Sequence, residues 1–288
     1  MLTESPFFNF FSIILRLTAL IVTMNFDEIF NQLFDTDKKD VFLPTGINSL
    51  DKFIHGGFLP ELVILSGRHN HGKSTILLNL VANFSYFQQF KGMLIVPKTS
   101  SKPLIRRLLS IIEDADVEKL EDELVFERLM DLKKTLLSKV LVEYDPISID
   151  DILSKAFQSK VSYLIIDDFQ YLLEAYYFSN KFFVESLVKI NKFIRDNGIP
   201  VFLSLPALAS AEKRYGAQIP RLMDLYRSDL ISNYANKIFL TYRAHSLGIE
   251  YDENGNESKE ILELYLEKNS NGKKGHLVLK YDECGKIF

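Results

Sequence analysis

Residues 61–87 contain the feature that most constrains the fold of this chain. An apolar run, ELVILSG (61–67), predicts a buried strand, and STILLNLVANFSYF (74–87) has the apolar period of a helix. Between them lies GRHNHGKST (67–75), which matches the pattern Gly-x-x-x-x-Gly-Lys-Ser in full. A strand, this loop and a helix in direct succession predict a phosphate-binding loop at the start of an α/β fold.

Each residue type in the loop suits an anionic phosphate. The glycines allow backbone angles that direct successive N–H groups at phosphate oxygens, and the following helix places its positive end there. Lys73 can reach the outer phosphates, and the hydroxyl of Ser74 can bind Mg²⁺. We therefore predict that ATP or a similar nucleotide is bound by Gly67, Arg68, His69, Asn70, His71, Gly72, Lys73, Ser74 and Thr75.

The two histidines of this loop lie two residues apart. A zinc site needs further ligands, and the sequence shows no partner cluster for them. We interpret His69 and His71 as loop residues near the nucleotide rather than metal ligands. The single cysteine, Cys284, excludes an internal disulfide framework and a cysteine-based zinc site, and it suits a reducing cytosol.

A second polar cluster follows the apolar run YLII (163–166). Asp167 directly ends this predicted strand, as expected for a carboxylate that orders the Mg²⁺ shell. Asp168 is either a water-activating acid or an ordinary polar residue at a strand end, because adjacency alone does not guarantee catalytic geometry. Gln170 either senses the terminal phosphate or caps a loop. We thus predict Lys73, Asp167, Asp168 and Gln170 as catalytic residues, with Ser74 and Asp167 as Mg²⁺ ligands.

Apolar runs and helical periods alternate through the rest of the chain. Helices are predicted by the periods at 104–139, 148–160 and 184–198, and further buried strands by the runs at 92–97, 140–145, 161–172 and 199–206. Such alternation predicts a mainly parallel sheet with helices on both faces. Antiparallel strands at the C-terminal edge are predicted by 237–243, 261–268 and 275–282, which Gly/Asn-rich turns connect.

The N-terminal forty residues differ from the rest. Residues 1–23 form a hydrophobic extension that is short for a membrane span and holds Arg16 near its middle, so a membrane partner is not expected. This extension is an anchor, a helix that packs on the domain, or a segment missing from the mature protein. Residues 24–40 predict an amphipathic helix and a charged linker, and that helix packs either on its own domain or on a neighbouring subunit. The predicted ATPase domain covers 41–288.

Several segments in order resemble the ATPase domain of the DnaB-type replicative DNA helicases, a RecA-like group of P-loop NTPases. They are TGINSLDKFIHGGF (45–58), the glycine loop, LIRRLLS (104–110), YLIIDDFQYL (163–172), LMDLYRSDLISNYANKIFLTYR (222–243) and LELYLEKNSNGKKGHLVLKY (262–281). The resemblance implies a hexameric ring in the cytoplasm, ATP between subunits, and single-stranded DNA through the centre. It also implies a role for the helix of 24–34 as a linker that grips the next subunit.

The same resemblance assigns roles to individual residues. Lys73, Ser74, Asp167 and Gln170 take the nucleotide, Mg²⁺ and sensor positions, and 225–231 takes the position of the DNA-facing loop. Arg227 and Arg221 are the candidates for DNA phosphate contacts. The net charge of −4 gives the chain no general basic character, so any nucleic-acid contact needs such a local patch. Other nearby cations either add to this patch or are solvated surface: Lys213, Arg214 and Arg243.

The sequence departs from the family pattern at two transition-state positions. Lys98 stands where the family has the glutamate that polarises the attacking water, and Ser270 where it has an arginine finger. Lys268 matches a second cationic position of that turn and is the finger candidate, with Lys273 and Lys274 as alternatives that lack a planar fork. Tyr226 also replaces a preferred arginine in the DNA-facing loop.

Two functions of different classes are consistent with these residues. The first is a DnaB-like helicase-type ATPase that binds ATP and Mg²⁺, acts on single-stranded DNA in replication, and hydrolyses slowly. The second is a catalytically degenerate nucleotide-binding assembly or regulatory protein of the same fold. A nucleotide kinase is a weaker third possibility, because the sequence shows no lid or acceptor-site signal.

Overall fold

The computed structural model describes residues 42–97, 101–114, 132, 134–136, 138–144, 148–174, 179–214, 218–251 and 255–288. The chain divides into two compact units, Met1–Val41 and Phe42–Phe288. The predicted extension 1–23, the linker helix within 24–40 and Lys98 all lie outside the described residues, as does most of 115–139. Within the described ranges, no helix is long and apolar enough to cross a membrane.

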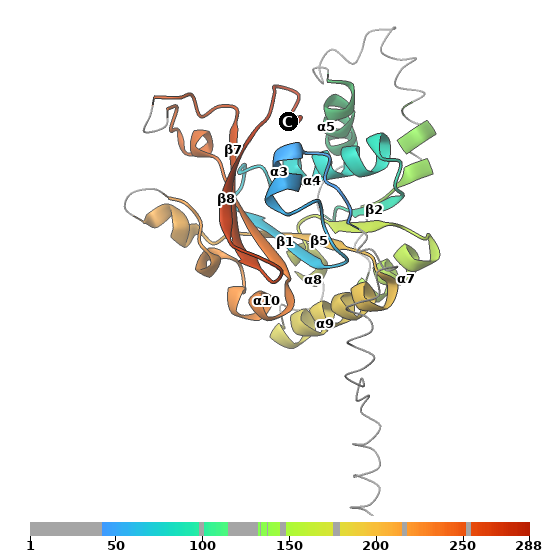
Figure 1. Cartoon of the computed structure of the whole chain (residues 1–288). Helices are drawn as coiled ribbons and strands as arrows, with labels where there is room; N and C mark the ends of the chain where they lie inside the picture. Colours follow the sequence, from blue (N-terminus) through green and yellow to red (C-terminus); the bar gives the residue numbers. More distant parts are fainter. Residues whose placement is uncertain are drawn as a thin grey trace, which may run out of the picture. The chain divides into compact units, whose positions relative to one another are not determined.

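One eight-stranded sheet organises the described part of the second unit (Figure 1). Its order is β3-β2-β4-β5-β1-β6-β7-β8. The strands are β1 (Leu62–Gly67), β2 (Gly92–Ile95), β3 (Val140–Glu143), β4 (Tyr163–Ile166), β5 (Val201–Pro206), β6 (Lys237–Tyr242), β7 (Ile261–Asn269) and β8 (Gly275–Lys280). Pairs from β3 to β6 are parallel, whereas β7 and β8 are antiparallel additions. The predicted sheet and its antiparallel edge are confirmed.

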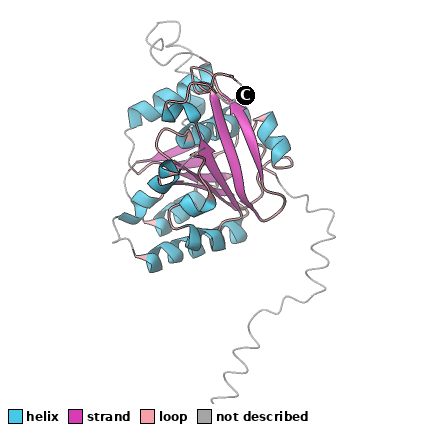
Figure 2. Cartoon of the chain, turned by 90° about the vertical axis from the view of Figure 1, so that its left-hand side faces the viewer, coloured by secondary structure: helices cyan, strands magenta, loops and turns pink. Residues whose placement is uncertain are grey.

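Helices cover both faces of this sheet, as the alternation predicts (Figures 1 and 2). One hydrophobic core holds residues of α3 (Asn48–Phe53), α4 (Lys73–Val81) and α5 (Ser101–Glu113), and the other holds residues of α7 (Ile149–Gln158), α9 (Asn180–Asn197) and α10 (Ser228–Tyr234). Successive residues of β1 point into alternate cores, Val63 into the first and Ile64 into the second. The sheet is therefore buried on both sides along its parallel part.

Shorter helices complete the description. They are the π-helix η1 (Ala82–Phe87), α8 (Gln170–Glu174) and the 3₁₀ helices η3 (Ala209–Lys213), η4 (Leu222–Asp224) and η5 (Ala244–Leu247). The predicted helix 74–87 is thus an α-helix that widens into a π-helix. The wider turn brings the amides of Asn83 and Gln88 to the carbonyls of Thr45 and Pro44, each at 2.8 Å. Ser148 is the predicted N-cap of α7 and accepts the amide N–H of Asp151.

Candidate nucleotide-binding site

The loop between β1 and α4 is shaped by its two glycines. Gly72 precedes α4 with φ +86°, a left-handed angle that glycine adopts without strain. A Cβ at Gly67 would lie 2.0 Å from Oγ1 of Thr241, so β1 and β6 approach too closely there for any side chain. The loop therefore has both the backbone freedom and the close packing that the motif predicts.

Lys73 crosses this loop. Its Nζ donates hydrogen bonds to the carbonyls of Gly67 at 2.9 Å and Arg68 at 3.0 Å. Burial lowers the pKa of the Lys73 ammonium, while the nearby carboxylates of Asp168 and Asp167 raise it. The loop thus curls around a partly desolvated cation, which strengthens the attraction of that cation for an anion.

Asp167 lies at the end of β4 and is almost fully buried. Its Oδ2 accepts the hydroxyl of Ser74 at 2.8 Å, and its Oδ1 accepts the hydroxyl of Ser204 from β5. Burial is the main cause that raises the pKa of the Asp167 carboxyl, opposed mainly by the hydrogen bond from Ser204. Two residues 93 positions apart in sequence thus offer a hydroxyl and a carboxylate side by side, the oxygen donors that Mg²⁺ prefers.

Asp168 and Gln170 follow on the same side of the sheet. Asp168 adopts φ +54°, and its amide donates to Oγ of Ser204 at 2.7 Å. Nε2 of Gln170 donates to Oδ1 of Asp168 at 3.1 Å. Oε1 of Gln170 is buried and has no hydrogen-bond partner among the described residues. An unsatisfied acceptor of this kind is costly, and it is available to a donor that enters the site.

A polar cavity of about 350 Å³ lies over the loop. Its lining consists of His69, Asn70, Gly72, Lys73, Ser74, Thr75, Arg107, Asp168 and Arg243. A second cavity, of about 250 Å³, shares three of these residues, and its lining is Arg68, His69, Lys73, Asp168, Gln170, Tyr171, Pro206, Ala207 and Tyr226. The predicted loop residues and acids therefore meet around two adjoining polar spaces.

Two arginines at the first cavity were not predicted as nucleotide ligands. Nη2 of Arg107, on α5, donates to Oγ1 of Thr75 at 2.9 Å. Arg243 follows β6, and its guanidinium lies 4.7 Å from the ring centre of Tyr281. From the sequence, Arg243 was expected near DNA or in solvent. Its position directly after a parallel strand beside β1 is the signal that could have identified it, because ligands bind at the carboxyl ends of such strands.

The two loop histidines have different surroundings. His69 lines both cavities. The side chain of His71 is buried, and its Nδ1 accepts the amide N–H of Arg243 at 3.4 Å beside the ring of Tyr242. Neither histidine belongs to the one cluster of possible metal ligands found among the described residues.

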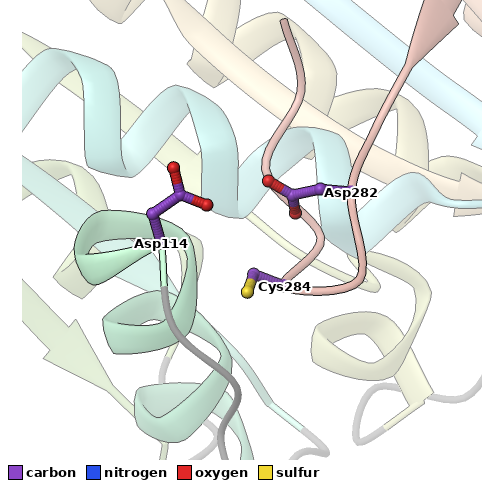
Figure 3. Close-up of side chains that lie close together, drawn as sticks. All are labelled: Asp114, Asp282 and Cys284. Atoms are coloured by element: carbon purple, nitrogen blue, oxygen red, sulfur yellow. The ribbon is translucent and has the colours of Figure 1, made fainter.

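That cluster consists of Asp114, Asp282 and Cys284, with ligand atoms within 4.8 Å of one another (Figure 3). Lys286 already binds both carboxylates. Its Nζ donates to Oδ2 of Asp114 at 2.8 Å, and its amide donates to Oδ1 of Asp282 at 2.9 Å. The hydrogen bond from Lys286 lowers the pKa of Asp114. We interpret the cluster as a clasp between the end of α5 and the last turn of the chain.

The DNA-loop candidates lie beyond the second cavity. Leu225 and Ile231 are buried, and residues 228–231 belong to α10, so only part of the predicted loop 225–231 is a loop. Arg227 stacks on the rings of Phe183 and Tyr226, at 4.8 and 5.2 Å. Elsewhere Arg221 and Lys213 are exposed, whereas Arg214 is paired with the buried carboxylate of Asp224.

The finger candidates lie at the far end of β7. Nζ of Lys268 donates to the carbonyl of Ser232 at 2.6 Å, within the same chain. Ser270, Lys273 and Lys274 are exposed in the following turn. Lys268 is therefore anchored on α10, and the exposed turn is the part free to meet another molecule.

Comparison with known proteins agrees with this site. Residues 43–288 match the family model for the DnaB-like helicase C-terminal domain. A probable replicative DNA helicase of Trieres chinensis is 26% identical over 279 residues, which cover 89% of this chain and 59% of the relative. The replicative DNA helicase DnaB of Geobacillus stearothermophilus is 22% identical over 274 residues, with 91% and 59% covered. The chain thus spans about 59% of the length of these two relatives.

Solved structures show the same fold. The ATPase domain of another protein superposes with a TM-score of 0.75 at 21% identity, covering 92% of this chain and 98% of that one. A DnaB-like replicative helicase, from a study of its interactions with primase, gives 0.73 at 20% identity, with 90% and 64% covered. A KaiC-like protein of Pyrococcus horikoshii gives 0.58 at 16% identity, with 86% and 98% covered. The predicted RecA-like fold is confirmed.

Proposed function

The chain belongs to the family of DnaB-like helicase C-terminal domains, and we propose that it is a helicase-type ATPase that binds ATP and Mg²⁺ and acts on single-stranded DNA in replication. One observation supports this proposal most. Lys73, Ser74 and Asp167, which are far apart in sequence, converge at a polar cavity at the carboxyl ends of parallel strands. This is where ligands bind in open α/β sheets.

Each residue then has a role. The backbone N–H groups of 68–73 and the ammonium of Lys73 bind the phosphates, and Ser74 and Asp167 hold Mg²⁺, which neutralises charge on the phosphate oxygens. Arg107 and Arg243 line the same cavity and add positive charge at its rim. The free acceptor of Gln170 faces a space shared with Lys73, which suits a residue that senses the outer phosphate.

We propose that hydrolysis is slow in this chain. Lys98 and Ser270 replace groups that activate water and stabilise transition-state charge in the resembled family, and an arginine finger is worth about 10³-fold or more in rate. Asp168 is the remaining acid beside Lys73, and it lines both cavities. One carboxylate oxygen of Asp168 already accepts Gln170, which leaves the other for an attacking water.

Single-stranded DNA and a hexameric ring are the proposed partners, both by family. Arg221 and Arg227 are the proposed DNA contacts, and Lys268 is the proposed finger. The anchored position of Lys268 requires its hydrogen bond to Ser232 to break before it can reach another subunit. The domain boundaries 1–23, 24–40 and 41–288, with a linker helix that grips a neighbour, and a cytoplasmic location are proposals of the same kind.

The alternative is an assembly or regulatory protein that binds the nucleotide without useful turnover. The exposed Ser270 at the finger position favours it, because a serine cannot offset charge that develops on a phosphoryl group. Both functions require the same cavity to bind a triphosphate. Only the first of them requires the bound triphosphate to be hydrolysed.

ATPase turnover with and without single-stranded DNA separates the two. We expect DNA to stimulate turnover and Lys73→Ala to abolish it, while Lys192→Ala, an exposed lysine of α9, leaves it unchanged. Tight triphosphate binding without turnover in either condition would establish the alternative. Absence of triphosphate binding by the wild-type chain would contradict both functions.

A further inference from the structure

The phosphate loop grips the end of β5 through both polar groups of one residue. The amide N–H of Ala207 donates to the carbonyl of Gly67 at 3.0 Å. The carbonyl of Ala207 accepts Nη1 of Arg68 at 3.1 Å. Arg68 is thus the side chain of the loop that reaches out of the nucleotide cavity to the neighbouring strand end.

The same strand end holds the segment proposed to face DNA. Ala207 forms an antiparallel bridge with Leu225. On either side of it, the amide of Leu208 donates to the carbonyl of Asp224 at 2.6 Å, and the amide of Tyr226 donates to the carbonyl of Pro206 at 3.2 Å. A displacement of Ala207 therefore passes directly to 224–226 through backbone hydrogen bonds.

The receiving segment is built to move as a unit. Asp224 is buried, and its carboxylate accepts the guanidinium of Arg214, the hydroxyl of Ser210 at 3.1 Å and the amide of Arg221 at 2.7 Å. These bonds tie η3 to η4, so a shift at Asp224 carries Arg221 with it. Beyond Tyr226, Arg227 begins α10.

The other end of this connection lies on the proposed phosphate ligand. Nζ of Lys73 donates to the carbonyl of Arg68 at 3.0 Å, and the second cavity places Arg68, Lys73, Gln170 and Tyr226 around one space. If Lys73 turns toward a phosphate, the backbone of Arg68 loses that restraint. Its guanidinium stays bonded to Ala207 and transmits the change.

We propose that Arg68 is a positioning residue that couples occupancy of the phosphate loop to the DNA-facing segment 221–227, through its hydrogen bond to the carbonyl of Ala207. The proposal rests on the proposed function, because it requires one site for a triphosphate and one for single-stranded DNA. Coupling of this kind is a ratio of affinities, and it is reciprocal between the two ligands.

The ratio is measured by the affinity for a single-stranded oligonucleotide with and without a non-hydrolysable ATP analogue and Mg²⁺. We expect the wild-type chain to show a change of about tenfold, within the usual range for coupled sites. Arg68→Met should reduce it to less than about twofold, because methionine fills similar space without a donor. Arg68→Lys, which can still donate to one carbonyl, should give an intermediate ratio.

A merely structural role would alter both affinities and the melting temperature but leave the ratio intact. Arg106→Met is the matched control, since Arg106 is an exposed arginine on α5, and it should keep the wild-type ratio. A wild-type ratio in Arg68→Met would overturn the coupling proposal while leaving the proposed function standing. So would a wild-type chain that binds both ligands with a ratio of one. A wild-type chain that binds neither ligand would overturn both.

A second readout needs no DNA. The chain has no tryptophan, so Tyr226→Trp introduces a single reporter beside Arg68 in the second cavity. We expect the analogue to shift the emission of this tryptophan, and the shift to disappear when Arg68→Met is added. An equal shift in the double variant would contradict transmission through Arg68.

Discussion

The parallel part of the sheet and its antiparallel edge bury their side chains in opposite ways. Every residue of β1, β2, β4 and β6 is buried, whereas β7 and β8 alternate between buried and more exposed positions. The parallel strands end at the phosphate loop and Asp167. The edge covers one face of a core and contributes Tyr281 beneath Arg243. The parallel part therefore builds the nucleotide site, while the edge supports it from outside.

The two regions meet at Gly72. A Cβ at this position would lie 2.7 Å from Cδ1 of Leu262, on β7. The antiparallel edge thus packs directly against the loop that begins α4. Substitutions in each region, taken from the largest expected effect to the smallest, test how different the two regions are and how closely they depend on each other.

Truncation should cost far more in the parallel part than at the edge. Leu164, in β4, is fully buried, so Leu164→Ala should lower the free energy of unfolding by about 4 kcal/mol. Val278, in β8, is 49% exposed, and Val278→Ala should change it by no more than about 0.5 kcal/mol. Denaturant unfolding of both variants measures the difference, and similar costs would contradict the contrast between the regions.

A buried ion pair stabilises the end of the parallel part opposite the loop. Nζ of Lys237 lies 2.5 Å from Oε1 of Glu61, and both side chains are nearly inaccessible. Lys237→Met leaves a buried carboxylate unpaired, so we expect a loss of about 3 kcal/mol. Adding Glu61→Gln should recover most of it in denaturant unfolding, and a double variant as unstable as the single one would refute this explanation.

The same pair predicts a pH effect. Burial is the main cause that raises the pKa of Glu61 above its ordinary 4.5, and loss of Lys237 raises it further. The folded Lys237→Met variant then binds more protons than the unfolded chain above pH 4.5. Its stability relative to wild type should therefore fall as pH rises from about 4.5. A relative stability that rises with pH would contradict the assignment.

Gly72 tests the contact between the regions. Gly72→Ala imposes a left-handed angle on alanine and a clash with Leu262, which together should cost about 2 kcal/mol. Leu262→Ala leaves a cavity of its own, but in a double-mutant cycle it should relieve the clash and give a favourable coupling of about 1 kcal/mol. Additive costs would show that the edge does not restrain the loop.

The smallest effect concerns the Mg²⁺ ligand. The raised pKa of Asp167 means that protons compete with Mg²⁺ from a pH above the ordinary value of 3.8. As pH falls toward 5, Mg²⁺-dependent triphosphate affinity should fall about threefold more in the wild type than in Asp167→Asn, which has no titrating group there. Calorimetric titration at several pH values measures this. Parallel profiles would contradict a role for Asp167 as the ligand.

Local patterns were enough to predict most of the fold. The continuous apolar runs of β1 and β5 and the alternating pattern of β7 predicted the parallel part and its edge, because burial on two faces or one leaves a different period in the sequence. The π-helix after α4 was not predicted. Its widened turn depends on tertiary bonds from Asn83 and Gln88 to 44–45, which no local pattern encodes.

The site was predictable to the extent that motifs record it. The loop and Asp167 follow from spacing, and the structure brings Ser74 and Asp167 together as expected. Arg107 and Arg243 were missed as neighbours of the phosphate loop, since their approach depends on how α5 and the end of β6 pack. The grip of Arg68 on Ala207 was invisible for the same reason, because it joins residues 139 positions apart.

Direct titration of the purified chain with a non-hydrolysable ATP analogue, with and without Mg²⁺, tests the central claim most directly. We expect saturable binding that strengthens with Mg²⁺ and weakens roughly a hundredfold, or about 3 kcal/mol, in Lys73→Ala. Unchanged affinity in Lys73→Ala, or no binding by the wild-type chain in the presence of Mg²⁺, would contradict it.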